Sequence, residues 1–576
     1  MRHAPMLCRS VLLALTALSA CAATTPPSGS AGDQQPGPGA YANFLVGQYA
    51  ASQFDFPQAA ASMREAMRDD RSALSGLAGE TFLLELLAGN TGTASALATA
   101  VPNDPLAQLL LAGSAARAGR WHEALRRYQA MPTPDGLTTV IKPLLIGWAL
   151  KGAGQTNDAL AALQPLAGVA NLRTIYALHI ALIADQAGLI ATAAQNYGIV
   201  QGGLSAPNLR LAAIIASWDA RSGDKAGAAR VLDSLNPDLA LAMTVPALKA
   251  SVGTAPVRTA TDGLAESYVN LAAAFSDEQQ TDTRPAAQVH RQQTVMILLQ
   301  LALQLRPNLS PARLLLSDVM DNGHNAAVAM TPLMTITASD PLYPLAAMRR
   351  AVLLSRLGQE DDARALLRDL AAAYPWSAEP LLALGDLLRG DSHYIEAAAA
   401  YTEALPRLPA NSPAQWLVYY DRGMSYDQGG NWKLAQPDLQ QALKLSPGQP
   451  YVLNYLGYSW AVKKQNLLQA RQMIEQALQA VPNDGAVVDS LGYVMLQQGD
   501  SHGAVTTLTK AVALAPNDPE INAHLGDAYA AAGEHLEASL QWRRALQLGP
   551  DATLNARLLA KLQQEQATAE PATSKN

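Results

Sequence analysis

Residues 490–516 read SLGYVMLQQGDSHGAVTTLTKAVALAP, and residues 524–550 read HLGDAYAAAGEHLEASLQWRRALQLGP. Both stretches have a Leu-Gly pair near the start, a second glycine seven residues after the first, an alanine five residues later and a closing proline. Small residues let two helices approach closely, and glycine and proline mark turns and helix ends. Each stretch therefore predicts an antiparallel helical hairpin.

The glycine followed five residues later by an alanine recurs along the chain. It stands at Gly119/Ala124, Gly154/Ala159, Gly188/Ala193, Gly223/Ala228, Gly358/Ala363, Gly430/Ala435, Gly499/Ala504 and Gly533/Ala538. Neighbouring pairs are 34 or 35 residues apart wherever none is skipped. A sustained period of this length predicts an all-α solenoid, a superhelical array of roughly 12–14 stacked hairpins.

This pattern of residues and its spacing resemble the tetratricopeptide repeat. That family's pattern asks for Leu-Gly, an aromatic residue or leucine, Ala, Ala and Pro, and four further units follow it around Arg350, Leu384-Gly385, Arg422-Gly423 and Leu456-Gly457. Arg350 and Arg422 depart from the pattern, since leucine is expected there. The resemblance implies a superhelix closed by a C-terminal capping helix.

The register of that family also implies which side chains line the inner wall, where the first helix of each hairpin faces a partner. The expected partner-binding residues are Tyr420, Met424, Asp427, Tyr451, Asn454, Tyr458, Asp489, Tyr493 and Asp527. Tyrosines offer broad apolar contact with a hydroxyl, and carboxylates favour basic or amide-rich partners. We expect Tyr455 to pack between hairpins instead. The implied function is binding of a protein or peptide, without catalysis and without a small-molecule substrate.

A narrower resemblance covers residues from about 450 to 550. The segments LNYLGY at 453–458 and DSLGY at 489–493 resemble the C-terminal repeats of proteobacterial repeat lipoproteins. Some members of that group are outer-membrane adaptors that bring substrates to a periplasmic carboxyl-terminal processing protease. The alternative is a structural scaffold for an envelope export or polysaccharide secretion machine.

The first forty residues resemble the export signal of a lipoprotein. Arg2 and Arg9 precede an apolar run, which ends in Leu-Ser-Ala-Cys at residues 18–21. We expect residues 1–20 to be a signal peptide, Cys21 to carry the lipid, and residues 21–40 to be a disordered tether. The sorting rules of such lipoproteins, applied to Ala22, favour the periplasmic face of the outer membrane. The alternative is an ordinary secretory peptide, cut after Ala20 or Ala22.

Beyond the tether, we predict a divergent N-terminal array over residues 41–250 and an irregular junction over 251–307. A C-terminal array over 308–550 and a capping helix with a tail over 551–576 complete the chain. Within the junction, helices are expected at about residues 264–275 and 288–305, joined by a long polar segment at 276–287.

Composition and spacing argue against several other functions. The net charge of −7, with no basic stripe, makes the chain a poor ligand for nucleic acid. His122-Glu123 starts a zinc-protease pattern, but Arg126 occupies the second histidine position. The sequence contains no Walker or Cys-x-x-Cys motif, and residues 499–503 (GDSHG) have the letters of Gly-x-Ser-x-Gly at the predicted turn between two helices, not between a strand and a helix as that motif requires. We therefore expect no metal, no cofactor and no enzymatic activity.

Overall fold

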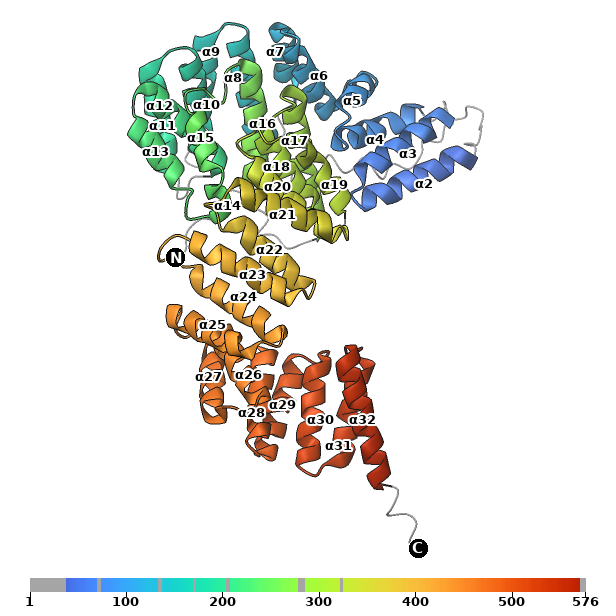
Figure 1. The fold of residues 1–576 in the computed structure, drawn as a ribbon. Coiled ribbons are helices and arrows are strands. Elements are labelled where there is room, and N and C mark those ends of the chain that lie inside the picture. Colours follow the sequence, from blue (N-terminus) through green and yellow to red (C-terminus); the bar gives the residue numbers. More distant parts are fainter. Residues whose placement is uncertain are drawn as a thin grey trace. The chain divides into compact units, whose positions relative to one another are not determined.

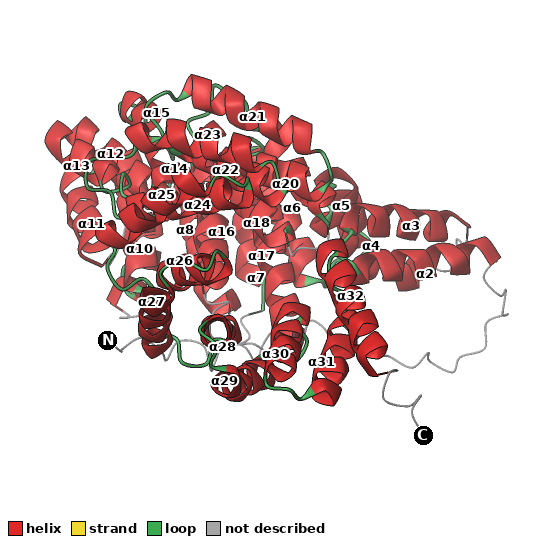
Figure 2. Cartoon of the chain, turned by 60° about the horizontal axis from the view of Figure 1, so that its bottom comes forward, coloured by secondary structure: helices red, strands yellow, loops and turns green. Residues whose placement is uncertain are grey.

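The computed structural model describes residues 38–69, 74–132, 137–168, 172–203, 208–277, 285–321 and 325–569. Every regular element in these ranges is a helix (Figure 2). The predicted signal peptide, Cys21 and nearly all of the tether lie outside the described residues, as does the tail after residue 569. The helices form two compact units, Met1–Tyr374 and Pro375–Asn576.

The N-terminal unit begins with six consecutive helical pairs (Figure 1). They are α2 (Pro38–Ser52) with α3 (Phe56–Asp69), α4 (Leu74–Leu87) with α5 (Thr91–Ala98), α6 (Pro105–Arg117) with α7 (Trp121–Ala130), α8 (Leu137–Gly152) with α9 (Thr156–Leu163), α10 (Arg173–Gln186) with α11 (Ile190–Gly203), and α12 (Leu209–Ser222) with α13 (Lys225–Asp233).

Eight further helices complete this unit. Two are short, α14 (Leu239–Ala242) and α15 (Val245–Ser251), and two are long, α16 (Ala260–Asp277) and α17 (Pro285–Leu305). Two more pairs follow, α18 (Ser310–Met320) with α19 (Ala326–Met330) and α20 (Tyr343–Arg356) with α21 (Glu360–Ala373).

The C-terminal unit is a regular row of pairs. It contains α22 (Glu379–Gly390) with α23 (Tyr394–Ala404), α24 (Gln415–Gln428) with α25 (Trp432–Leu445), α26 (Pro450–Val462) with α27 (Leu467–Ala480), α28 (Gly485–Gln497) with α29 (Ser501–Leu514), α30 (Pro519–Ala531) with α31 (His535–Gln547), and the last helix α32 (Ala552–Ala569). The apolar side chains Leu554 and Leu558 of α32 pack with Trp542 of α31. The all-α array and its capping helix are confirmed.

The small residues act as the sequence predicts. A Cβ atom on Gly492 would lie 2.4 Å from Cγ of Leu508 on the paired helix, and one on Gly526 would lie 2.5 Å from Cδ1 of Trp542. Gly499 turns the chain between α28 and α29 with φ of +86°, a conformation that glycine adopts without steric cost. Close helix approach therefore requires these glycines.

The two helices expected at the junction are present as α16 and α17, and both are longer than predicted. Their position differs from a simple continuation of the row. α16 packs against α8 and α10, and α17 packs against α4 and α6. These two helices thus cover the first helices of four of the six pairs, from α4 to α10.

Candidate protein-binding face

The first-helix face of the N-terminal unit is filled by side chains of α16 and α17. The Gln300 side-chain amide donates to the Leu87 carbonyl (3.1 Å), and that of Gln304 donates to the Leu110 carbonyl (3.0 Å). Both glutamines are buried. A partner could reach this face only by displacing a hairpin whose own polar groups are satisfied there, which costs free energy for each group left unpaired.

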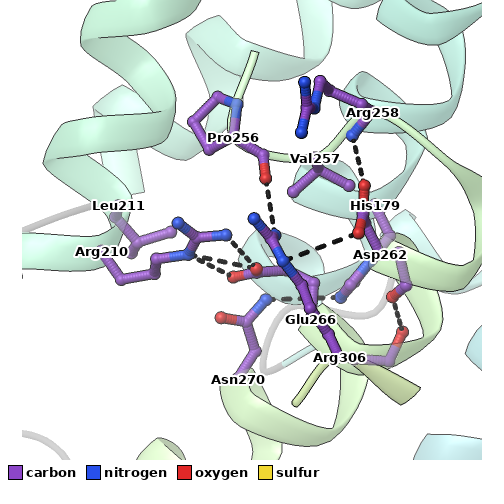
Figure 3. Close-up of polar contacts among 12 residues, drawn as sticks. His179, Arg210, Leu211, Pro256, Val257, Arg258, Asp262, Glu266, Asn270 and Arg306 are labelled. Atoms are coloured by element: carbon purple, nitrogen blue, oxygen red, sulfur yellow. Dashed lines mark hydrogen bonds and ion pairs between the residues drawn. The ribbon is translucent and has the colours of Figure 1, made fainter. Parts of the chain in front are cut away.

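A buried polar network holds α16 in that position (Figure 3). Arg210 of α12 forms an ion pair with Glu266 of α16 (Nη2 to Oε2, 2.6 Å), and Nε2 of His179 on α10 lies 3.5 Å from Nδ2 of Asn270 on α16. Indole Nε1 of Trp148 on α8 donates to Nδ1 of the same histidine (3.0 Å). Burial lowers the pKa of His179 to about 4, although the charge of Glu266 opposes this shift. His179 is therefore neutral at pH 7 and accepts the indole hydrogen bond through Nδ1.

The C-terminal unit carries an aromatic row on its first helices, made of Tyr420, Tyr455, Tyr458, Tyr493 and His524. Ring centroids are 5.9 Å apart for Tyr420 and Tyr455, 5.3 Å for Tyr458 and Tyr493, and 4.6 Å for Tyr493 and His524. The four tyrosines are half-buried and His524 is buried. Each contact joins one repeat to the next, so the row runs across α24, α26, α28 and α30.

First helices also pack directly on one another in this unit, as α22 on α24, α26 on α28 and α28 on α30. The second helices of successive pairs approach each other less closely. Stacked units with a constant small rotation curve toward the side where their helices are closest. The aromatic row lies along these first helices, and their place on the inner wall of the array stays a prediction.

Three of the predicted acidic residues have intramolecular partners one repeat away. Asp427 accepts from Nζ of Lys463 (2.8 Å) and Oγ of Ser459 (3.0 Å). Asp527 accepts from Nε1 of Trp542 (2.8 Å) and forms an ion pair with Lys561 of α32. Their charges link neighbouring helices.

Asp489 is the third, and its partner is His524, whose Nδ1 lies 2.9 Å from Oδ2. Burial lowers the pKa of His524, but the charge of Asp489 and the hydrogen bond between them raise the pKa by more, so the net shift is upward. The pair lies directly beside the ring of Tyr493. His524 was not among the predicted site residues, because the family register selects Ala523. Aligning the repeats on Leu491-Gly492 and Leu525-Gly526 places Asp489 opposite Ala523 and leaves His524 one position away, so the sequence carries no direct signal for this pair.

The other predicted residues of this face are not all equivalent. Tyr451 is 53% exposed, while Met424 and Asn454 are half-buried. Oδ1 of Asn454 is buried without a hydrogen-bond partner in the described part of the chain. Tyr455, expected to pack between hairpins, contacts the Tyr420 ring and Asp427 of the preceding hairpin. The role of these residues in binding stays a prediction.

Two further groups of this face escaped the sequence prediction. Burial and the charge of Asp386 raise the pKa of Asp421 to about 7, although Arg389 opposes the shift. Arg422, which replaces the expected leucine, makes two hydrogen bonds to Asp438 of α25 (2.6 and 2.7 Å). The guanidinium also lies near the rings of Tyr419 and Tyr426. The departure at residue 422 thus replaces an apolar contact by an ion pair between the two helices of one repeat.

Neither a metal site nor a membrane-spanning helix occurs in the described ranges. No cluster of three or more His, Cys, Asp or Glu side chains suited to a metal ion occurs there. None of the described helices combines the length and apolar character that bilayer crossing requires.

Family models of the tetratricopeptide repeat match residues 345–375, 420–485 and 490–553. The matched residues include all of α25, α26, α27, α29, α30 and α31 and parts of α24 and α28, and they contain all five residues of the aromatic row. These stretches are tetratricopeptide repeats, whose stacked hairpins form extended concave surfaces for protein binding.

Two curated relatives share part of the sequence. TPR repeat-containing protein PA4667 of Pseudomonas aeruginosa is 27% identical over 183 residues, which are 32% of this chain and 30% of the relative. Interferon-induced protein with tetratricopeptide repeats 2 of Cricetulus griseus is 28% identical over 95 residues, or 16% of this chain and 20% of the relative. The matches thus span less than a third of either relative.

Solved structures overlap with the chain at low identity. The Cut9–Hcn1 hetero-tetramer of APC/C includes a chain that is 15% identical, with 96% of this chain and 98% of that chain covered and a TM-score of 0.36. YrrB, described as a TPR protein with an unusual peptide-binding site, is 20% identical, with 33% of this chain and 96% of that chain covered and a TM-score of 0.26.

Proposed function

We propose that this tetratricopeptide repeat protein works by binding an extended protein segment along the first-helix face of its C-terminal unit. The contrast between the two units carries the proposal. In the N-terminal unit α16 and α17 cover the equivalent helices, whereas the described helices of the C-terminal unit pack closely only on helices one or two places along the chain. Its aromatic row is left half-buried, as a binding surface requires.

The chemistry of this face indicates the kind of segment it suits. Half-buried tyrosine rings offer apolar area at a low entropic cost, and their hydroxyls can hydrogen-bond a partner. Because Asp427, Asp489 and Asp527 already have partners, recognition rests on the rings more than on negative charge.

We further propose that the protein is an adaptor held by a lipid on Cys21 at the periplasmic face of the outer membrane. The lipoprotein-like residues 18–21 and the resemblance of residues 450–550 to adaptor lipoproteins support this role. The adaptor would bring substrates to a periplasmic processing protease. If the adaptor holds the protease and its substrate at one membrane surface, their effective concentration relative to each other rises without any new contact between them.

The test compares crosslinked captures from membranes that contain wild type or the variant Tyr458→Ala/Tyr493→Ala. We expect the double variant to lose a processing protease or its substrate at least ~10-fold, since aromatic residues dominate such surfaces. Tyr394→Ala is the matched control, because it removes a tyrosine from the second helix α23 of the same unit.

An identical capture by wild type and the double variant would contradict binding at this face. The rate at which the substrate is degraded in cells that lack the protein distinguishes the protease adaptor from the structural scaffold. Slower turnover supports the adaptor, whereas unchanged turnover despite lost capture would exclude it and favour a structural scaffold.

A further inference from the structure

The N-terminal unit contains a pocket that the binding face does not use. Its volume is about 570 Å³, within the range of small-ligand sites. The walls come from α12, from α14, α15 and the segment 252–258, from α16, from the segment 306–309 and α18, and from the segment 340–342 and α20. Residues far apart in the sequence therefore meet around one space.

Four arginines line the pocket and only two carboxylates do. The arginines are Arg210, Arg258, Arg306 and Arg349, and the carboxylates are Asp318 and Asp340. Figure 3 shows Arg210, Arg258 and Arg306 gathered around Glu266 and Pro256 from three separate segments. The lining thus has an excess of positive charge.

The arginines are not all fully satisfied. Within the described residues the guanidinium of Arg258 has no ion-pair or hydrogen-bond partner, although its backbone N–H donates to Asp262. Arg349 binds Asp318 through Nη2 (2.7 Å), while its Nη1 is buried with no partner in the same part of the chain. Both side chains therefore retain donors for an anion.

The guanidinium of Arg306 also has more positive charge than negative charge acting on it. Its Nη1 donates to the Pro256 carbonyl (2.9 Å), and its Nε lies 3.7 Å from Asp262. Burial lowers the pKa of Arg306, the charges of Arg210 and Arg258 lower it further, and Asp262 and Glu266 only partly oppose them. An added negative charge would be favourable beside these three guanidinium groups.

The carboxylates near the pocket are already engaged. Glu266 binds Arg210, and Asp318 binds Arg349. Asp262 accepts from the backbone N–H groups of residues 258 and 259 at the start of α16, and Asp340 accepts from Ser310 and from the Leu342 N–H. In the described part of the chain these carboxylates leave the guanidinium of Arg258 and Nη1 of Arg349 without a partner.

Apolar side chains form most of the remaining wall. They include Leu241 and Leu248, Val269 and Ala273, and Leu314 and Leu345. Such walls gain free energy by burying an apolar body, at roughly 25 cal/mol per Å².

We propose that this pocket binds a carboxylate joined to an apolar body, with Arg258, Arg306 and Arg349 as its anion-binding residues. The carboxylate pairs with guanidinium donors and the apolar part lies against the leucines. A fatty acid and the C-terminus of an apolar peptide share this chemistry, and the experiment distinguishes them. The proposal is independent of the partner-binding face.

Isothermal titration calorimetry of the full chain with decanoate and with acetyl-Leu-Val-Leu provides the test. We expect saturable binding of at least one of these probes, with decanol and the amidated peptide at least ~10-fold weaker because they lack the charge. Tighter binding of decanoate identifies a lipid source, and tighter binding of the peptide identifies a protein C-terminus.

Two variants and one control locate the binding. Arg258→Gln/Arg349→Gln should weaken binding of the carboxylate at least ~10-fold, and Ala273→Phe should block it by filling the space. Arg173→Gln removes an exposed arginine from α10 and should leave binding unchanged. Unfolding curves establish that each variant is folded. Absence of saturable binding up to millimolar concentrations, equal binding of the uncharged probes, or equal binding by the double arginine variant would overturn the proposal.

Discussion

Arg210→Met is expected to lower the free energy of unfolding of the N-terminal unit by about 3–5 kcal/mol. Arg210 contacts both carboxylate oxygens of Glu266, with distances of 2.6, 3.1 and 3.2 Å. The Glu266 side chain is only 1% exposed, so removing its partner leaves a buried charge uncompensated. Because Glu266 lies on α16, the loss should loosen the hairpin that covers the first helices.

Hydrogen exchange of α16 and α17 measures this loss locally, which matters because repeat arrays need not unfold in one step. The matched control is Arg210→Met/Glu266→Met, which removes both charges. It should recover most of the protection, since apolar replacement of a buried ion pair is often neutral. A loss below 1 kcal/mol in Arg210→Met, or equal losses in both variants, would contradict the role assigned to the pair.

His524→Leu is expected to destabilise α28 and α30 by a similar amount, about 3–5 kcal/mol near pH 6. The substitution removes the partner of Asp489, whose side chain is 9% exposed, and the ring contact with Tyr493. Both first helices should then exchange amide hydrogens faster. Asp489→Leu/His524→Leu is the control without an orphaned carboxylate and should lose less protection.

The same pair makes stability depend on pH. Since the folded-state pKa of His524 is raised, its contribution is fully present below the unfolded value of about 6.5 and is lost as pH rises through the folded pKa. Wild type should therefore lose protection in α28 and α30 as pH rises above about 6.5, whereas the double leucine variant should not. If protection in α28 and α30 changes with pH in the same way in wild type and in the double leucine variant, His524 carries no charge in this pair.

Much of the fold could be predicted because its signals are local. Gly492 and Leu508 lie within one hairpin, and the spacing of small and large residues records their contact directly. The same holds for Gly526 and Trp542. A period that repeats such contacts predicts the array without knowledge of distant neighbours.

The position of α16 and α17 left no comparable signal. Gln300 donates to a carbonyl 213 residues earlier, and the residues between them do not encode that contact. The pocket likewise combines side chains from separate helices. Asp427, Asp489 and Asp527 have ion-pair partners about one repeat further along the chain, at Lys463, His524 and Lys561. A register that marks the positions of one face within each repeat does not record such contacts between repeats.

Site-specific photocrosslinking in cells tests the binding face most directly. A photoreactive phenylalanine is placed at Met424, Tyr458 or Tyr493 on the first helices, and at Leu468 or Leu536, which are 78% and 69% exposed on the second helices α27 and α31. We predict that the same partner protein is crosslinked from the first three positions and from neither leucine position. Crosslinks to that partner from residues 468 and 536, with none from residues 424, 458 and 493, would contradict the account.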